Sequence, residues 1–374
     1  MDGNNNGFEQ IGSQYDPQYG QNPYGYGMPS YSGYGMPQEP VFDERGTRKN
    51  FSRIGLSYFA LWLISIVLGN VLALAAYLLL PTSVYENYLV TILIAIIPMY
   101  LIGAPVCMLM MQKVPAETPA RTHWNAGQII GGFIVAYALM RFGSIIGVYI
   151  GSMIEAVFPD AQATTSNVEE LVMTGEMWVN VIAMVMIGPV VEELLFRKLL
   201  CDRLKPYGDA VTVVVTGLMF GIFHGNVTQG VYACLLGAFL AYVYLRTGNI
   251  FITIGYHVGV NFMGSVIPLL IMNASNVDGM DAVLASGDAD MLAEFVAENL
   301  SSFILIGGYV LMIYGIMFCG AIIMLVTLVR GRVKLYKGRI TIPSGRGFTT
   351  VILNVGMILF LLGGIFEILL STFG

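Results

Sequence analysis

MWVNVIAMVMIGPVVEELLFR, residues 177–197, is an apolar run that ends in two glutamates and an arginine. Its length suits a helix that crosses a hydrocarbon core of about 30 Å. Glu192 and Glu193 follow Gly188-Pro189, a pair that breaks or kinks a helix and lets it restart with proline near its first position. The run therefore predicts a transmembrane helix with two carboxylates inside the membrane.

Eight further apolar blocks flank this run. Together they predict nine spans, at 54–80, 88–111, 128–154, 177–197, 209–227, 228–246, 249–272, 300–329 and 348–372. The chain is only 11% charged and its mean hydropathy is +0.71, whereas soluble domains carry about 25% charged residues. The blocks do not alternate with period two, which favours helices over a β-barrel. The predicted fold is an all-α, polytopic transmembrane helix bundle of about nine spans.

Residues 1–50 differ from the rest of the chain because they are rich in Gly, Tyr, Asn, Gln and Pro. This composition is typical of a disordered tail. The tail lacks the basic start and short apolar core of a signal peptide, so we expect the first span to act as the insertion signal. The predicted domains are this cytoplasmic tail and a transmembrane helical domain over 51–374. The cysteines show no CxxC spacing, so neither a disulfide frame nor a thiolate metal site is expected.

Lysine and arginine are distributed unevenly between the predicted loops. With the N-terminus inside, 17 of the 18 basic residues fall on the cytoplasmic side, and only Arg141 lies within a span. Cytoplasmic loops accumulate basic residues, so the N-terminus is predicted to be cytoplasmic. The membrane topology accounts for the positions of the basic residues, so no nucleic-acid partner is expected. The lipid bilayer is an expected partner. The tail and the lack of organellar signals favour a multi-pass protein of a bacterial plasma membrane.

Few ionisable residues lie inside the predicted spans, where each is costly and therefore indicates function. Arg197 follows Glu193 by four residues, a spacing that pairs charges on a helix, so Glu192 is predicted to be the freer carboxylate. For Arg141 and Glu367 we expect a structural role.

His224 is predicted to lie at the same depth as Glu192. Each is 16 residues from a turn near Tyr207-Gly208, which is roughly 24 Å along two antiparallel helices. His257 lies on the order of 12 Å above the cytoplasmic start of its span, and Asn261 follows one turn later on the same face. These groups could merely form a salt-bridge cluster or hydrogen-bond neighbouring helices. Their convergence favours a hydrolytic site instead.

Two hydrolytic schemes fit these residues. In the first, Glu192 is a general base that activates water with His224, while His257 and Asn261 donate hydrogen bonds to the oxyanion. In the second, Glu192, His224 and His257 bind Zn²⁺ with an open position for water. The sequence contains no HExxH motif, and the residues leave both schemes open.

Three motifs carry a family resemblance. Residues 192–197 (EELLFR) resemble EExxxR, residues 220–224 (FGIFH) resemble FxxxH, and residues 257–261 (HVGVN) resemble HxxxN of the CPBP family. That family comprises the type II CAAX prenyl endopeptidases and bacterial bacteriocin-processing and immunity-type membrane proteins. The resemblance covers roughly 177–272, which would be the catalytic core.

The resemblance implies an intramembrane endopeptidase whose substrate is a membrane-associated protein or peptide, either a prenylated CAAX type or bacteriocin-like. Its members have been described both as metallopeptidases and as glutamate-dependent enzymes, so Zn²⁺ remains a possible cofactor. The implied roles are Glu192 as catalytic carboxylate, Glu193 and Arg197 as its supporting pair, His224 as partner in water activation, and His257 with Asn261 as the oxyanion-binding group.

Two other classes of function compete with the peptidase. A proton-coupled transporter would show internal repeats with matching broken helices, but each motif occurs once. A non-catalytic immunity or scaffold protein would tolerate loss of the carboxylate, whereas every motif residue is present. The peptidase is therefore the favoured interpretation, and no oligomeric state is predicted.

Overall fold

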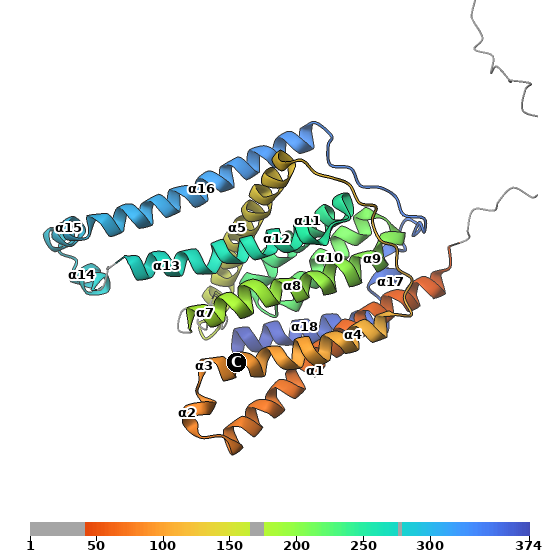
Figure 1. The fold of residues 1–374 in the computed structure, drawn as a ribbon, viewed down its shortest axis with the longest axis horizontal. Helices are drawn as coiled ribbons and strands as arrows, with labels where there is room; N and C mark the ends of the chain where they lie inside the picture. The colour runs from red at the N-terminus through yellow and green to blue at the C-terminus, as the bar shows by residue number, and fades with distance from the viewer. Residues whose placement is uncertain (1–41, 165–175, 276–278) are drawn as a thin grey trace, which may run out of the picture. The chain divides into compact units, whose positions relative to one another are not determined.

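The structure, a computed structural model, describes residues 42–164, 176–275 and 279–374. The regular elements in this part of the chain are helices, and the described residues form no strand (Figure 1). The predicted all-α fold is therefore confirmed. Most of the predicted tail lies outside the described residues, and helix α1 begins at Glu44, ahead of the tail's expected end.

Eight helical stretches among the described residues are long and apolar enough to cross a membrane. They are Glu44–Leu79, Tyr88–Met111, Ala126–Val157, Met177–Tyr207, Val227–Thr247, Ile250–Ala274, Leu300–Val329 and Val355–Phe373. The remaining predicted span, 209–227, corresponds to α10 (Asp209–Phe223), whose 15 residues are fewer than a full crossing needs.

Several of these stretches contain π-helical segments. The stretch Tyr88–Met111 consists of α3 (Tyr88–Ile96), η1 (Ile97–Gly103) and α4 (Ala104–Met111). The stretch Met177–Tyr207 consists of α7 (Met177–Asn180), η2 (Val181–Ile187), α8 (Gly188–Glu193), η3 (Leu194–Cys201), α9 (Asp202–Leu204) and the 3-10 turn η4 (Lys205–Tyr207). The stretch Ile250–Ala274 consists of α12 (Ile250–Asn261), η5 (Phe262–Val266) and α13 (Ile267–Ala274). Pro98, Pro189 and Pro268 lie inside or just after three of the π segments. Proline lacks an N–H and crowds the preceding turn, and a wider π turn relieves both effects.

Asparagine caps begin several of the other helices. At α5 (Ala126–Val157), Asn125 and Gln128 form a reciprocal capping box, with both hydrogen bonds at 2.9 Å. Asn226 and Asn354 cap α11 (Val227–Thr247) and α18 (Val355–Phe373) through their side chains. The other helices of the described residues are α1 (Glu44–Leu79), α2 (Thr82–Tyr85), α14 (Met280–Ser286), α15 (Ala289–Glu298), α16 (Leu300–Val329) and α17 (Gly347–Val351).

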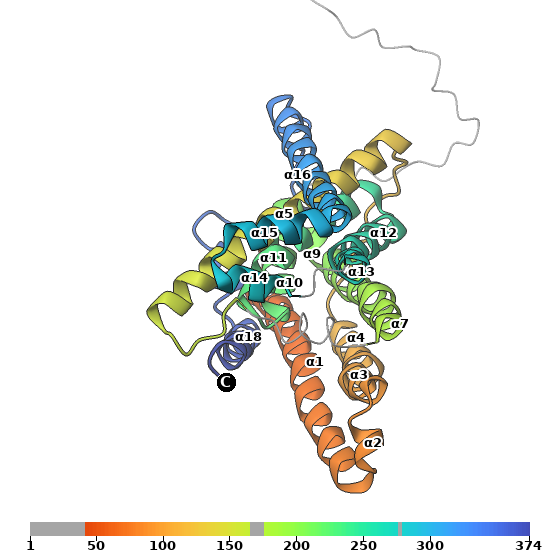
Figure 2. The ribbon, with the colours of Figure 1, turned by 90° about the vertical axis from the view of Figure 1, so that its left-hand side faces the viewer.

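Helices α10 and α11 form the centre of the bundle. In both ribbon views they lie between α5 with α16 on one side and α1 with α18 on the other (Figures 1 and 2). Glycines allow the close packing: an ideal Cβ on Gly217 of α10 would lie 2.7 Å from the Cβ of Ala238 on α11. One on Gly143 of α5 would lie 2.5 Å from the Cα of Tyr232. Small residues of this kind are typical of helix contacts inside membranes.

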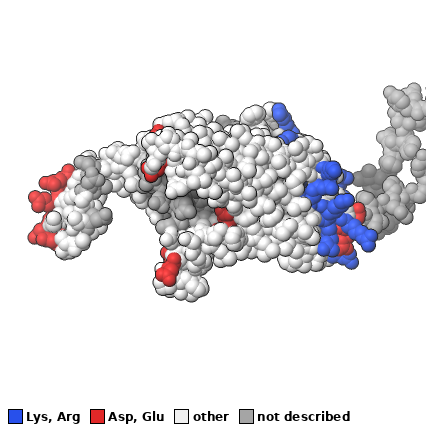
Figure 3. All heavy atoms as spheres, turned by 90° about the horizontal axis from the view of Figure 1, so that it is seen from below, with Lys and Arg blue, Asp and Glu red and all other residues white. Residues whose placement is uncertain are grey.

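Charged side chains separate to opposite ends of the molecule. Figure 3 shows Lys and Arg gathered at one end and a group of acidic side chains at the other. At the basic end, the segment 330–346 crosses the turn that joins η4 to α10. Asp209 N–H donates to the Tyr336 carbonyl at 2.9 Å, Tyr336 N–H donates to the Asp209 carboxylate at 2.8 Å, and Ile340 N–H donates to the Pro206 carbonyl at 2.9 Å. These bonds fix the turn to a segment from a distant part of the sequence.

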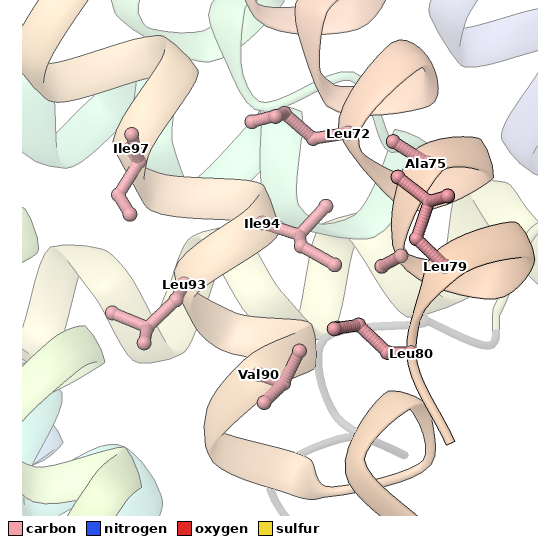
Figure 4. Close-up of a pocket in the computed structure, with 9 residues that line it drawn as sticks. Leu72, Ala75, Leu79, Leu80, Val90, Leu93, Ile94 and Ile97 are labelled. Atoms are coloured by element: carbon pink, nitrogen blue, oxygen red, sulfur yellow. The ribbon is translucent and has the colours of Figure 1, made fainter. Parts of the chain in front are cut away.

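An apolar groove lies between the C-terminal part of α1 and the segment formed by α3 and η1 (Figure 4). Aliphatic side chains of the two helices line it: Leu72, Ala75, Ala76, Leu79, Leu80, Val90, Leu93, Ile94 and Ile97. None of these residues is polar or ionisable, so the groove presents a hydrocarbon surface and no reactive group.

Candidate active site

Glu192 and Glu193 end α8, the short α-helical segment between η2 and η3. The sequence predicted that Gly188-Pro189 would break or kink this helix and restart it. The structure carries the helix through both residues, with π turns on either side, so the break and restart do not occur. The two carboxylates therefore project from a continuous helix and not from a helix N-terminus.

Glu193 is completely buried and its carboxylate is fully engaged. Arg197 donates to it through Nε at 2.9 Å and through Nη2 at 3.1 Å. The Nδ1 atom of His257 lies 3.1 Å from the Oε1 atom of Glu193. Arg197 is also completely buried, so breaking this pair would leave an uncompensated charge at a cost of about 3–5 kcal/mol.

Glu192 lies next to this pair but is not part of it. Its side chain is 17% exposed, and its Oε2 atom lies 3.8 Å from the Nε2 atom of His257, too far for a hydrogen bond. Among the described residues, no side chain donates a hydrogen bond to Glu192 within ordinary distance. The structure thus places Arg197 on Glu193 and leaves Glu192 as the open carboxylate.

His224 forms the C-terminal cap of α10. Its Nδ1 atom lies 2.7 Å from the Phe220 carbonyl oxygen. A carbonyl only accepts, so Nδ1 carries the hydrogen and the Nε2 atom of the neutral ring keeps its lone pair. Glu192 and His257 both lie within electrostatic range of this ring. The structure therefore brings His224 near Glu192 and His257, although the three residues come from three different helices.

The Phe220 ring packs against both imidazoles. Its centroid is 4.7 Å from that of His224 and 5.7 Å from that of His257, both in edge-to-face geometry. The guanidinium carbon of Arg197 lies 5.2 Å from the same centroid. The first residue of FxxxH thus spaces the polar groups of the site as well as packing the core.

Asn261 ends α12, one turn beyond His257. Its Nδ2 atom donates to the carbonyl of Met184 at 3.1 Å. Met184 belongs to η2, so this bond ties α12 to the helix that carries the glutamates. An amide has two N–H groups, and the bond to Met184 uses one of them.

Comparison with known families bears on residues 174–263, which match the model described as Type II CAAX prenyl endopeptidase Rce1-like. The chain carries an Rce1-like domain. The three motifs all fall within the matched residues, and the predicted family resemblance is confirmed. No curated protein and no solved structure matches the chain. The domain and the apolar helices make this an integral membrane protein with a protease domain of the CAAX endopeptidase type.

Tyr100 joins the site from outside the Rce1-like domain. It lies in η1, and an ideal Cβ on Gly188 would lie 3.3 Å from its hydroxyl and 4.0 Å from the Oε1 atom of Glu192. The two side chains therefore converge above Gly188. Tyr100 is not predicted from the sequence, because a tyrosine in an apolar span carries no charge and forms no spacing pattern with the three motifs. Pro98 inside an apolar span was the available signal, since it marks the π segment that contains Tyr100.

The π segments of the described residues all border this site. Segment η1 contains Tyr100, η2 contains Met184 and η3 contains Arg197. Segment η5 begins directly after Asn261. Such segments are uncommon and often occur at functional sites. Here a π turn rotates the following side chains relative to an α-helix, which changes where each group points.

The predicted zinc ligands are Glu192, His224 and His257. Among the described residues, no three His, Cys, Asp or Glu side chains are grouped to hold a metal ion. The His257 Nδ1 atom is occupied by Glu193, and its Nε2 atom is 3.8 Å from Glu192. Both features suit a histidine that shares a metal with Glu192, but His224 is not grouped with them, so the three side chains as placed do not form a zinc site.

Proposed function

We propose that the chain is an intramembrane endopeptidase in which Glu192 and His224 activate a water molecule. One observation carries this proposal. Arg197 and His257 occupy the Glu193 carboxylate, which leaves Glu192 as the open carboxylate beside an imidazole whose Nε2 atom is free to accept a proton. A general base needs a lone pair within hydrogen-bond reach of the proton that it removes from water.

The reaction would proceed by direct attack of water on the scissile carbonyl. Glu192 removes a proton from the water, and the water oxygen bonds to the carbonyl carbon while the carbonyl oxygen becomes an oxyanion. The tetrahedral intermediate collapses, the C–N bond breaks, and the captured proton passes to the leaving amine nitrogen. His224 orients the water and shares its proton through Nε2.

His257 and Asn261 would stabilise the oxyanion. A His257 ring with hydrogen on both nitrogens donates through Nδ1 to Glu193 and through Nε2 toward the substrate. Asn261 keeps one N–H on the Met184 carbonyl and offers the other. Donors fixed in advance toward a developing charge contribute strongly to catalysis, because they need no reorganisation during the reaction.

The proposed substrate is a membrane-associated protein or peptide, of the C-terminally prenylated CAAX or the bacteriocin-like type. The Rce1-like domain supports the first type. The exposed aliphatic side chains Val190 and Leu194 flank the glutamates on the same helix, so an apolar substrate could approach them from the bilayer. Zinc-dependent hydrolysis is the alternative scheme for cleavage of the same peptide bond. A chelator distinguishes it from the glutamate-dependent scheme.

The test is cleavage of synthetic peptides by protein reconstituted in liposomes. Farnesylated CAAX peptides and their unprenylated counterparts are incubated with wild type, Glu192→Ala and His224→Ala, and the products are identified by mass spectrometry. Glu294→Ala is the matched control, because Glu294 is an exposed carboxylate on α15. We expect the control to cleave like wild type and the two site variants to lose at least about a hundredfold in rate.

Wild-type rates in both site variants would overturn the proposal. A parallel series with a strong chelator decides between the two schemes. Activity that is lost with chelator and restored by zinc would replace the glutamate-dependent scheme with the metal scheme.

A further inference from the structure

Helix α18 lies outside the Rce1-like domain, yet one of its faces packs against the turn that carries His224. Gly364, Glu367 and Ser371 are spaced by three and four residues, so they share that face. The turn joins α10 to α11 and contains His224 and Gly225.

Gly364 meets the end of α10, and Glu367 and Ser371 meet the turn directly. An ideal Cβ on Gly364 would lie 2.1 Å from the Cγ2 atom of Ile222, so the helix backbone touches the end of α10. The Ser371 hydroxyl donates to the Gly225 carbonyl at 2.8 Å. Between them, the Cγ atom of Glu367 lies 2.4 Å from the position of an ideal Cβ on Gly225.

Gly225 makes this contact possible. Its φ angle is +62°, a left-handed conformation that glycine adopts without strain. Glu367 also fills the space where any larger side chain at 225 would project. The backbone on the C-terminal side of His224 is therefore fixed by both its own conformation and the α18 side chain.

Glu367 is held from its other side by α1. The Nε1 atom of Trp62 donates to its Oε2 atom at 3.0 Å, and an ideal Cβ on Gly363 would lie 3.1 Å from the Trp62 ring. A carboxyl group within a membrane helix is costly. Here it links three elements, α1, α18 and the His224 turn, through one side chain.

We infer that Glu367 is a positioning residue that holds the His224 turn, and with it the imidazole, in place. This inference rests on the proposed function, because it concerns the ring that would activate water. Loss of the Glu367 side chain would let the turn shift while Glu192, His257 and the substrate contacts stay in place. Such a shift lowers kcat and leaves KM unchanged, because only the reacting geometry is altered.

The kinetic test compares Glu367→Ala, Glu367→Gln and the control Ile365→Ala. Ile365 lies on the same helix but is 51% exposed. Glutamine keeps the size of the side chain and the acceptor for Trp62. We expect Glu367→Ala to lose about tenfold or more in kcat at constant KM, and Glu367→Gln and Ile365→Ala to stay within about twofold of wild type. An unchanged kcat in Glu367→Ala, or an equal loss in Glu367→Gln, would overturn the inference.

A second readout does not depend on activity. The chain has only three histidines, so the ring nitrogens of ¹⁵N-histidine-labelled protein can be assigned by NMR through His224→Gln and His257→Gln. We expect the His224 signals to report an Nδ1–H tautomer that changes in Glu367→Ala and returns in Glu367→Gln, while the His257 signals stay constant.

The spectra and the kinetics separate the two hypotheses. If wild type cleaves no peptide, the proposed function fails, and the spectra still decide the inference. His224 signals that are unchanged in Glu367→Ala, or a loss of the His257 signals as well, would overturn the positioning role.

Discussion

At the scale of single residues, the site depends on the different surroundings of two adjacent carboxylates. Glu193 is buried with Arg197 and His257 as partners, whereas Glu192 is partly exposed and lies 3.8 Å from His257, beyond hydrogen-bond distance. A glutamate thus has a supporting role at position 193, whereas the glutamate at position 192 is accessible for chemistry. A one-residue step turns a side chain by about 100° on a helix, which is enough to separate these roles.

Tyr100→Phe tests the residue that joins the site from η1. Removing the hydroxyl deletes one hydrogen-bond donor above Gly188 and leaves the ring in place. A hydrogen bond contributes about 0.5–1.5 kcal/mol, so we expect kcat/KM to fall by roughly 2- to 13-fold. Tyr77→Phe is the control, because Tyr77 is 64% exposed at the far end of α1. Equal rates for the two variants would remove Tyr100 from the site.

Sequence spacing predicted part of this residue-scale picture. The interval of four between Glu193 and Arg197 is a local property of a helix, so the pair could be inferred before any fold was known. Tyr100 and Glu367 approach the site only through tertiary packing of η1 and α18, and no local spacing encodes that approach. Glu367 was predicted to be structural, and that role remains compatible with its contacts to Trp62 and Gly225.

At the scale of elements, the glycine contacts between helices set the spacing of the centre. Most predicted spans correspond to helices because long apolar runs are strong signals. The span at 209–227 was predicted too long: α10 ends at Phe223, since Gly225 adopts a left-handed turn and Asn226 caps the next helix. The π segments were not predicted, because their register depends on neighbouring helices as well as on proline.

Gly217→Ala tests the close approach of α10 and α11. The added Cβ would lie 2.7 Å from Ala238 and 2.9 Å from the Cys234 carbonyl, so the helices must separate. We expect destabilisation by about 1–3 kcal/mol, measured as the change in unfolding free energy in mixed micelles. Gly255→Ala is the matched control, since nothing lies within 4 Å of its Cβ, and there helix propensity predicts a gain of up to about 1 kcal/mol. The same change in both variants would contradict the packing argument.

At the scale of the whole molecule, opposite charge at the two ends predicts the orientation in the membrane. Lys337 lies in the segment 330–346 and Glu294 lies on α15, and Figure 3 shows basic and acidic side chains gathered at opposite ends. In cysteine-free protein carrying Lys337→Cys or Glu294→Cys, we expect a membrane-impermeant thiol reagent added to intact cells to label position 294 alone. Labelling at 337 alone would invert the predicted topology, because basic loops stay on the cytoplasmic side.

The hydrogen bonds between the segment 330–346 and the turn at 206–209 determine which parts of the chain can be transferred to another protein without loss of contacts. The Rce1-like domain ends at residue 263, yet its own turn is completed by Tyr336 and Ile340, and the His224 turn is completed by α18. Two turns of the matched region therefore depend on hydrogen bonds from residues C-terminal to it. Chimeras that graft it onto foreign membrane helices would need to bring the C-terminal third of the chain with it.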